Sequence, residues 1–399
     1  MKGSKSRAVV CLVSCVGEVY YTRNMLILKT IAESWDNVVA ITPGSLADSE
    51  GNHVIKHYSL PTPRANFWYH AEFSNTLRAV GKRLKNIFLL IQKLFQIKPD
   101  ILVCCEPDSW AVSIMAKCFL GCKVVVDLRE VYEDRVLSFP KIIQKPLRRM
   151  LKVLMTALSR FTNEVIHVSP ERQQVYSYLN KPGVVIGPYP ELHLFQPRDI
   201  SQNEVYANND QKSVIAIHAG ALRVTYASDQ LLKAMMLAAE LFPEIRLVVL
   251  GGIAGALSNV HLVESLKKKG ILELVKHVPY FEVVRTIQVS DIGINLVLPV
   301  DTTHVLAAPQ KLFEYMAAGI PVVAADVPTI RSIIKKYECG LLVDPTSPHE
   351  IASALVKFAQ DANMRKKMGQ NARRAAEAEF NWEIEKKKLY GVFKFLQFS

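Results

Sequence analysis

Short apolar runs alternate with longer amphipathic segments along the chain. Residues 7–16 and 38–42 are apolar runs of strand length, and residues 21–34 between them show helical periodicity. A strand, a helix and a second strand at this spacing predict a βαβ unit and hence a parallel sheet. Because the first run is short, contains two cysteines and leads directly into a helical pattern, we interpret it as a buried strand and not as a signal peptide.

The alternation continues to the C-terminus and is interrupted once. Further strands are expected at residues 101–105, 123–126, 165–169, 184–186, 214–218, 246–250, 275–278, 292–296, 320–325 and 340–343. Helices are expected at residues 73–97, 111–120, 141–161, 228–241, 260–269, 281–289, 311–318, 328–337, 348–360 and 362–379. The interruption, residues 191–212, is polar and rich in Asn, Gln and Asp, which is typical of a linker. The pattern therefore predicts two consecutive parallel α/β domains, residues 1–190 and 213–380. Ligands of such sheets bind beyond the carboxyl ends of the strands, and two facing sheets place that position in an interdomain cleft.

Composition restricts the class of protein and of partner. The chain has 399 residues, half of them hydrophobic, which predicts a sizeable core and argues against wholesale disorder. Its formal net charge of +12 predicts an anionic partner, such as nucleic acid, a phosphorylated ligand or anionic lipid. Seven cysteines occur without a CxxC pair, so we expect buried core residues in a reducing compartment, not a disulfide framework or a zinc site. No apolar run reaches the roughly 18–20 residues of a membrane-spanning helix.

Two predicted helices in the first half are basic. Residues 74–98 and 141–161 contain no Asp or Glu. These helices are either the solvated outer faces of crossover helices or a contact with an anionic membrane surface, which basic amphipathic helices with large aliphatic residues suit. Nucleic acid is the weaker interpretation, because the aromatic residues are not interleaved with the charges and no groove-reading motif is present.

The stretch from Ala308 to Val323 carries the most chemistry. It predicts a loop, a short helix ended by Gly319 and a buried strand. A helix N-terminus offers backbone N–H groups and a partial positive charge, and Lys311 adds a full charge, so the stretch suits a diphosphate. Glu314, one turn further on, can accept hydrogen bonds from sugar hydroxyls. The alternative is an ordinary helix and strand with Glu314 on the surface.

The first strand ends at Gly17, and this single glycine is no GxGxxG motif. Its isolation argues against a nicotinamide cofactor.

The C-terminal half resembles the family-4 glycosyltransferases (glycosyl transferases group 1), retaining enzymes that use nucleotide sugars and have the GT-B architecture. The resemblance rests on an ordered set of segments, each of them weak alone. They are His218-Ala219-Gly220-Ala221-Leu222, the strand ending in Gly251-Gly252, Val278-Pro279-Tyr280, Ser290-Asp291-Ile292-Gly293-Ile294, the stretch from Ala308 to Val323, Gly340-Leu341-Leu342-Val343-Asp344-Pro345 and Phe380-Asn381-Trp382. The resemblance implies two Rossmann-like domains that face each other across a cleft, with a C-terminal helix at about residues 381–399 that returns to the first domain.

The resemblance also assigns a donor site. Glu314 matches the glutamate that binds the donor ribose, backbone groups around Gln310, Lys311 and Leu312 would meet the diphosphate, and Gly220 would let the backbone approach it. Val278 and Tyr280 match the segment beside the nucleobase.

Two departures from the family pattern stand out. Leu306 occupies the position of the glutamate that grips the transferred sugar, for which Thr302, Thr303 or His304 would have to substitute. Arg223 matches the first of two cations that offset the charge of the leaving diphosphate. The lysine expected after it is missing, and Lys311 is the candidate replacement.

Acceptor-side candidates come from the first domain. Asp127, Arg129 and Glu130 follow a predicted strand, and Gly17 follows the first one. We take Asp127 and Glu130, with Arg223 and Lys311, as the candidate catalytic residues. Relatives often have His at the position of Arg129, and a local ion pair between Arg129 and Glu130 is the alternative interpretation.

The sequence thus predicts a retaining glycosyltransferase of the hexosyltransferase type. It would use a nucleoside diphosphate sugar as donor, with no metal or other cofactor, and would act in cell-envelope, exopolysaccharide or glycolipid synthesis. The acceptor would be lipid-linked or a polysaccharide, and the protein would be cytoplasmic and peripheral on the inner face of the membrane. A nucleotide-sugar epimerase of the same architecture and a non-catalytic binding protein at the membrane surface are the alternatives.

Overall fold

The computed structural model describes residues 6–14, 22–43, 55–61, 73–196, 213–255, 257, 259–276, 279–307 and 309–398. It divides into two α/β units, and the chain passes between them twice. The first unit comprises residues 1–187 and 385–399, and the second comprises residues 188–384.

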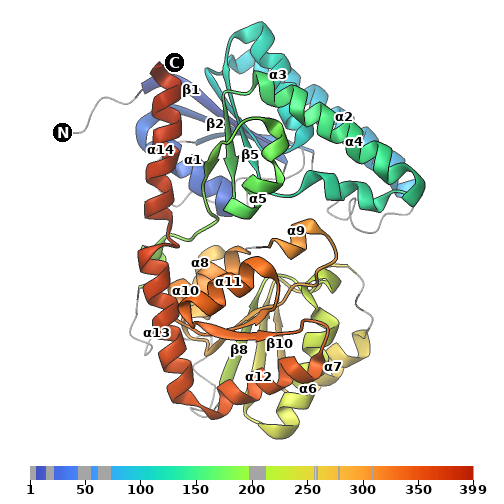
Figure 1. Ribbon diagram of the computed structural model, residues 1–399, viewed down its shortest axis with the longest axis vertical. Helices are drawn as coiled ribbons and strands as arrows, with labels where there is room; N and C mark the ends of the chain where they lie inside the picture. The colour runs from blue at the N-terminus through green and yellow to red at the C-terminus, as the bar shows by residue number, and fades with distance from the viewer. Residues whose placement is uncertain are drawn as a thin grey trace, which may run out of the picture. The chain divides into compact units, whose positions relative to one another are not determined.

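The first unit is built on a parallel sheet of seven strands in the order β3-β2-β1-β4-β5-β6-β7 (Figure 1). The strands are β1 (Ser6–Val13), β2 (Trp35–Pro43), β3 (Ile55–Leu60), β4 (Ile101–Cys104), β5 (Lys123–Leu128), β6 (Glu164–His167) and β7 (Val184–Val185). The connecting helices are α1 (Thr22–Ser34), α2 (Phe73–Ile97), α3 (Pro107–Leu120), α4 (Lys141–Phe161) and α5 (Pro170–Val175), with 3-10 turns at Tyr132–Ser138 and Ser177–Leu179. The strand order reverses between β1 and β4, which is where ligands of such sheets bind.

The second unit repeats this plan with six parallel strands in the order β10-β9-β8-β11-β12-β13. They are β8 (Val214–Ala219), β9 (Ile245–Leu250), β10 (Leu272–Val275), β11 (Ile292–Asn295), β12 (Val322–Ala325) and β13 (Gly340–Val343). One face packs on α6 (Ser228–Leu241), α7 (Val260–Lys268) and α12 (Pro348–Gln360). The other packs on α8 (Tyr280–Gln288), α10 (Gln310–Ala318), α11 (Pro328–Tyr337) and α13 (Ala362–Ala378). The reversal here lies between β8 and β11.

The last helix, α14 (Trp382–Phe398), begins in the second unit and ends in the first. Phe393 is buried and its ring lies 5.5 Å from that of Trp35, while Lys386 and Tyr390 both bind Glu33 of α1. These contacts attach α14 to the sheet face that α1 covers, opposite the layer of α2, α3 and α4 (Figure 1).

The structure differs from the sequence predictions in several places. The strand expected at residues 275–278 is β10, three residues earlier, because Gly270 ends α7 in a left-handed conformation and Leu272 pairs with Leu247. The boundary between units falls after Gly187 and not after residue 190. Residues of the expected linker belong to the second unit, since the turn Leu192–Phe195 buries Phe195 in its core. From residue 197 the predicted linker lies outside the described residues. Strand β3 and the short helices α5 and α9 (Thr302–Val305) were not predicted.

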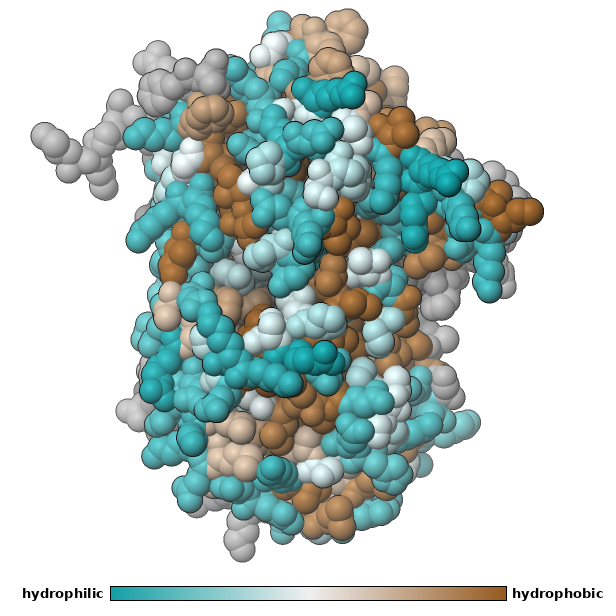
Figure 2. Space-filling model, in the orientation of Figure 1, coloured by the Kyte–Doolittle hydropathy of each residue, from teal (hydrophilic) through white to brown (hydrophobic). Residues whose placement is uncertain are grey.

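Part of the surface of the first unit is both apolar and basic. In Figure 2, hydrophobic and strongly hydrophilic residues lie side by side on the flank where Figure 1 labels α2 and α4. No helix in the described part of the chain is long and apolar enough to cross a membrane.

Candidate functional site

The carboxyl ends of β8 and β9 approach each other closely. Gly220, after β8, has a φ of 122°, and Gly251, after β9, has a φ of 131°. A side chain at Gly251 would lie 2.7 Å from the backbone nitrogen of Ala221 and 2.8 Å from the carbonyl carbon of Gly220. Both glycines are therefore required for this loop path. The loop continues into a 3-10 turn, Val224–Tyr226, which Arg223 precedes.

Helix α10 begins beside these strand ends without a side-chain cap. Its N-cap is Pro309, in an extended conformation, and no acidic residue occupies its first turn. The start of this nine-residue helix is thus a point of positive potential that no carboxylate of its own first turn offsets. Leu312 is fully buried in the core, so only its backbone can contact a ligand here.

Lys311 is the most unusual residue of this region. It is 8% exposed, and its Nζ has no hydrogen-bond partner. The ammonium group lies 4.4 Å from the ring centroid of Tyr226, which provides a cation–π contact. Burial lowers the pKa of Lys311 to about 7, a shift that Glu314 opposes and Arg223 reinforces. A buried cation poised near neutrality is typical of a site that binds an anion.

Glu314 lies one turn further along α10 and is 5% exposed. Its Oε1 accepts hydrogen bonds from the hydroxyl of Tyr280, at 2.9 Å, and from Nε2 of Gln310, at 2.9 Å. Burial raises the pKa of Glu314, and these two hydrogen bonds together with Lys311 oppose that shift. The structure therefore brings together Gln310, Lys311, Glu314 and Tyr280, and it contradicts the alternative of a solvated Glu314.

Two residues that the predicted site did not include, Tyr226 and His218, interact with Lys311, and a third buried polar residue lies at the end of the neighbouring strand β11. Tyr226 supports the Lys311 ammonium, as described above. His218, on β8, is fully buried, neither ring nitrogen has a hydrogen-bond partner, and burial together with Lys311 lowers its pKa well below the ordinary value. Asn295, at the end of β11, is also fully buried with both amide atoms unpartnered. The position of His218 and Asn295 at strand ends was visible in the sequence, but a polar residue there is not distinguishable from an ordinary turn residue.

The remaining donor-side candidates are placed differently. His304, in α9, has its Nδ1 2.6 Å from Asp301 Oδ1, within its own turn. Arg223 is exposed, and its backbone N–H donates to the Ser228 hydroxyl. Val278, on the donor side, and Gly17, on the acceptor side, lie outside the described residues.

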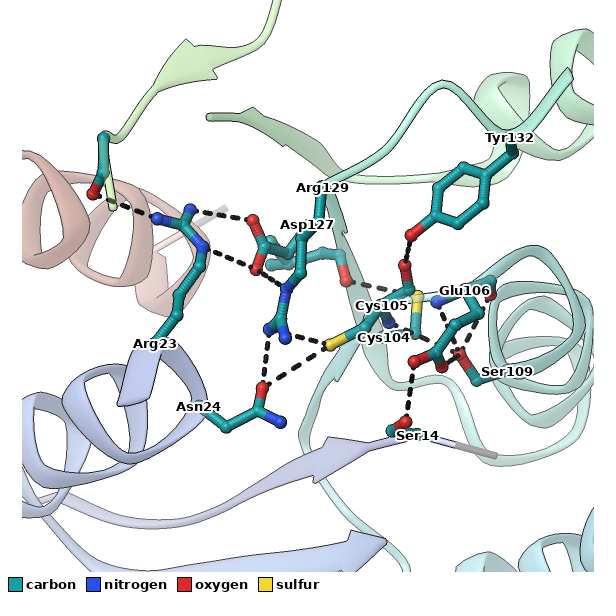
Figure 3. A network of polar contacts seen from close by, with 12 residues as sticks. Ser14, Arg23, Asn24, Cys104, Cys105, Glu106, Ser109, Asp127, Arg129 and Tyr132 are labelled. Atoms are coloured by element: carbon teal, nitrogen blue, oxygen red, sulfur yellow. Dashed lines mark hydrogen bonds and ion pairs between the residues drawn. The ribbon is translucent and has the colours of Figure 1, made fainter. Parts of the chain in front are cut away.

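In the first unit, Asp127 lies at the centre of an ion network at the strand ends (Figure 3). Its Oδ1 is 2.8 Å from Nη2 of Arg23, and its Oδ2 is 3.0 Å from Nε of Arg23 and 2.7 Å from Nε of Arg129. Burial alone would raise the pKa of Asp127, but the two guanidinium groups outweigh it and hold the pKa well below its usual range. Both oxygens are occupied, so the geometry favours a structural anion over a proton acceptor for Asp127.

Arg129 and Glu130 take separate partners. Arg129 donates to Asn24 Oδ1 at 2.6 Å and contacts Cys105 Sγ at 3.1 Å (Figure 3). Glu130 instead pairs with Arg135 at 3.0 Å. An ion pair between Arg129 and Glu130 is therefore not the arrangement found.

Glu106 is a further buried carboxyl group that the sequence did not single out. It follows β4, at the reversal of strand order, and accepts hydrogen bonds from Ser14 at 2.7 Å and from Ser109 at 3.1 Å (Figure 3). Burial, and next the charge of Asp108, raise its pKa. The pKa of Glu106 is thus shifted in the direction opposite to that of Asp127 in the same network. Within the described residues, no group of three or more His, Cys, Asp or Glu side chains is arranged to hold a metal ion.

Comparison with protein families matches residues 200–375 to the family described as Glycosyl transferases group 1. This match covers most of the second unit and confirms the resemblance drawn from its sequence segments. The assignment to family 4 stays a prediction.

Two relatives illustrate the similarity in sequence. A D-inositol 3-phosphate glycosyltransferase of Corynebacterium diphtheriae is 29% identical over 218 residues, which are 52% of this chain and 49% of that protein. A putative glycosyltransferase of Bacillus subtilis, YtcC, is 22% identical over 71% of this chain and 70% of that protein. The chain thus spans about half the length of the first relative.

Solved structures resemble the whole chain in fold. A sucrose-phosphate synthase from Thermosynechococcus elongatus superposes with a TM-score of 0.70 at 14% identity, covering 98% of this chain and 99% of that one. Anabaena HepE, solved in complex with UDP-glucose, gives 0.68 at 13% identity, covering 98% and 100%. These similarities confirm the predicted fold of two Rossmann-like units.

Proposed function

We propose that this chain, with a second unit of the glycosyl transferases group 1 type, transfers a sugar from a nucleoside diphosphate sugar to an acceptor hydroxyl. The observation that carries the proposal is the convergence of Arg223, Lys311 and Glu314 at the uncapped start of α10. Two cations and a helix N-terminus suit a diphosphate, and a carboxylate held by two donors suits the hydroxyls of a ribose. The similarity to a D-inositol 3-phosphate glycosyltransferase and to a structure solved in complex with UDP-glucose supports the same proposal.

In this proposal, binding and catalysis share the same cations. The bond from the sugar C1 to the β-phosphate oxygen breaks, and a bond from C1 to the acceptor oxygen forms. The departing phosphate takes the acceptor proton, so the reaction proceeds with retention and without a protein nucleophile. Arg223 and Lys311 offset the negative charge that develops on the diphosphate, and Lys311 takes the place of the lysine missing after Arg223. We propose that no metal ion is required, so that EDTA leaves the rate unchanged.

The first unit is assigned to the acceptor. The network around Asp127 holds Arg129 in a fixed orientation, and Glu106 and Glu130 are carboxyl groups able to contact an acceptor hydroxyl. Because the chain is basic and carries exposed basic helices, we propose a lipid-linked or polysaccharide acceptor, in cell-envelope synthesis at the inner face of the membrane.

A panel of nucleoside diphosphate sugars tests the donor site by thermal shift, because a ligand that binds only the folded state raises the melting temperature. We expect nucleotides of one particular base to raise the melting temperature of the wild type. Glu314→Ala should lower the affinity for these nucleotides at least tenfold, because hydrogen bonds to a charged group contribute about 1.5–3 kcal/mol. Lys335→Met, an exposed lysine of α11, is the control. No shift with any nucleotide would contradict the proposal.

Activity is then tested with the best ligand. Slow release of free nucleoside diphosphate, accelerated by an acceptor, supports transfer. Conversion of the donor into its epimer without an acceptor identifies an epimerase instead. Binding without any turnover identifies a non-catalytic protein, for which Leu306 at the position of the sugar-gripping glutamate is the relevant departure.

A further inference from the structure

Helix α4 is apolar on both of its sides. Met155 and Leu158 are buried against the core of the first unit, as a crossover helix requires. The opposite side exposes Ile142 at 86%, Val153 at 70% and Met150 at 61% of their surface. Positions 142, 146, 149, 150, 153, 157 and 160 recur at helical spacing and define one outward stripe. The aliphatic side chains of this stripe therefore lie largely outside the core of the unit.

Helices α2 and α3 extend this apolar surface. Leu84 and Phe88 of α2 are 61% and 59% exposed, and Phe119 of α3 is 72% exposed. The rings of Phe95 and Phe119 lie 6.0 Å apart and join the two helices at the surface. Helix α2 packs on α3, and α3 packs on α4, so the three form one layer on one face of the sheet (Figure 1). We call the outward side of this layer the outer helical face.

The charges on the outer helical face are of one sign. Lys141, Lys145, Arg149, Lys152 and Arg160 are exposed on α4, which contains no acidic residue. The acid nearest to them in the ion pairs, Asp134, is buried and lies 3.7 Å from Arg148. Figure 2 shows the resulting mixture of hydrophobic and hydrophilic residues on this flank.

The combination of exposed aliphatic side chains with positive charges distinguishes between the partners that could bind the outer helical face. A second copy of the chain would bring two unpaired basic stripes together, which like-charge repulsion disfavours. Nucleic acid would pair with the cations but gain nothing from Ile142, Met150 and Val153. An anionic bilayer satisfies both features, because the aliphatic residues enter the boundary between head groups and acyl chains while the cations meet the phosphates.

We propose that the outer helical face is the docking surface of this protein for an anionic lipid bilayer. Ile142, Met150 and Val153 insert, and Lys145 and Arg149 contact lipid phosphates. The inference rests on the membrane location within the proposed function and is independent of the donor chemistry. It accounts for an apolar stripe that the fold itself does not use.

Vesicle sedimentation with the full chain tests the inference. Vesicles of phosphatidylcholine with about 30% phosphatidylglycerol by mole, which carry a negative surface potential, are compared with vesicles of pure phosphatidylcholine. We expect binding to the anionic vesicles at low salt, and strong weakening in high salt. Lys145→Ser with Arg149→Ser should reduce affinity by about 5-fold per cation removed, or about 25-fold together. Ile142→Ser with Val153→Ser should reduce it by a similar factor without changing the salt dependence.

Matched controls lie on exposed positions of the second unit. Leu241→Ser, at 67% exposure, and Lys335→Ser should leave vesicle binding unchanged. All four altered residues of the outer helical face are exposed, so the melting temperature and the nucleotide-induced shift should also stay at wild-type values.

Several results would overturn the inference. Wild-type binding to anionic vesicles that neither pair of substitutions weakens would place the membrane contact elsewhere. Loss with the charge pair alone would reduce the contact to electrostatics. Absence of vesicle binding would exclude a bilayer as the occupant. So would a self-association or single-stranded DNA binding that both pairs abolish, which would assign the face to another partner. None of these results would affect nucleotide binding, so the donor proposal is judged separately.

Discussion

At the residue scale, the site depends on charges held at unfavourable positions. Lys311 is buried without a hydrogen bond, and Asp127 is buried but fully paired. An unpaired buried polar group costs stability unless a ligand completes its contacts, whereas a paired one is part of the framework. The two residues are therefore expected to respond to substitution in opposite ways.

Lys311→Met should stabilise the free protein and weaken nucleotide binding. Methionine fills a similar volume without a charge, so we expect about 1–3 kcal/mol of added stability. Denaturant unfolding without ligand and nucleotide titration measure the two effects. A Lys311→Met variant that is less stable than the wild type and binds nucleotide equally well would contradict the assignment of Lys311 to the nucleotide site. Lys335→Met is the control for loss of an exposed lysine.

Nucleotide affinity should depend on pH through Lys311. Its pKa is lowered to about 7, so the ammonium form dominates below that pH and the neutral form above it. A bound diphosphate favours the ammonium form and raises this pKa, so binding takes up a proton and affinity falls as pH rises above about 7. Titrations of the wild type and Lys311→Met between pH 6 and 9 separate this effect from ionisation of the nucleotide. Parallel profiles for the two proteins would exclude Lys311.

Asp127→Asn should destabilise the first unit by about 3–5 kcal/mol, because two guanidinium groups lose their buried counter-charge. The pKa of Asp127 is lowered on folding, so its stabilising contribution is present above the ordinary carboxyl pKa of 3.8 and is lost only as pH falls through the lower folded value. Urea unfolding at pH 7 measures the loss. Asp326→Asn, which breaks an exposed pair with Arg331, should leave the midpoint unchanged.

At the scale of elements, the position of α10 is set by β11 and β8. A side chain at Gly293 would lie 2.4 Å from the ring of Tyr315, whose hydroxyl accepts from the Ala219 N–H at 2.9 Å and donates to the Ile217 carbonyl at 3.2 Å. The helix is thus held against the strands at a fixed distance. This contact orients the whole helix start that carries Lys311 and Glu314.

Gly293→Ala should therefore disturb both folding and the site. The added methyl group overlaps a fully buried ring, which typically costs about 1–3 kcal/mol, and displacement of α10 should weaken nucleotide binding. Thermal unfolding with and without nucleotide measures both. Gly391→Ala is the control, because a methyl group there meets nothing within 4 Å and the helix α14 gains stability from alanine. An unchanged nucleotide affinity in Gly293→Ala would show that α10 tolerates the shift.

At the scale of the whole molecule, the two passages of the chain between units are hydrogen-bonded to each other. The N–H of Gly187 donates to Glu385 Oε2 at 2.7 Å, and the carbonyl of Gly187 accepts from Arg23 Nη1 at 3.0 Å. Arg23 also binds Asp127, so the Asp127 network and the first passage share one residue. Helix α14 then completes the first unit from the far end of the sequence.

Phe393→Ala should lower the stability of the first unit by about 3–5 kcal/mol, because the residue is 1% exposed and packs on Trp35. The second unit should keep its nucleotide-dependent melting shift. Calorimetry with and without nucleotide resolves the two units. Phe395→Ala, on the same helix at 63% exposure, should have little effect, and an equal loss in both variants would contradict this attachment of α14.

The periodicity of the chain was enough to predict the two parallel sheets and most of the helices, α10 among them, whereas α14 was expected only from the family resemblance. Apolar runs of strand length and amphipathic repeats reflect burial along a single element, and each can be recognised locally. For the same reason Lys311 and Glu314 were identifiable, since they lie at defined positions of one helix. The position of strand β10 was predicted three residues too late, because apolar residues continue from one segment into the next and only the pairing with β9 sets which of them form the strand.

Tertiary structure alone decided which polar residues are paired. Arg23 and Asp127 are 104 positions apart, and Tyr280 and Glu314 are 34 apart, so no local pattern joins them. Only packing shows that Tyr226 lies beneath Lys311, and that the aliphatic residues of α4 include a stripe that faces outward. The sequence determined what each element is made of, because burial within an element is periodic. The fold determined which charges meet, because such contacts join strand ends that are distant along the chain.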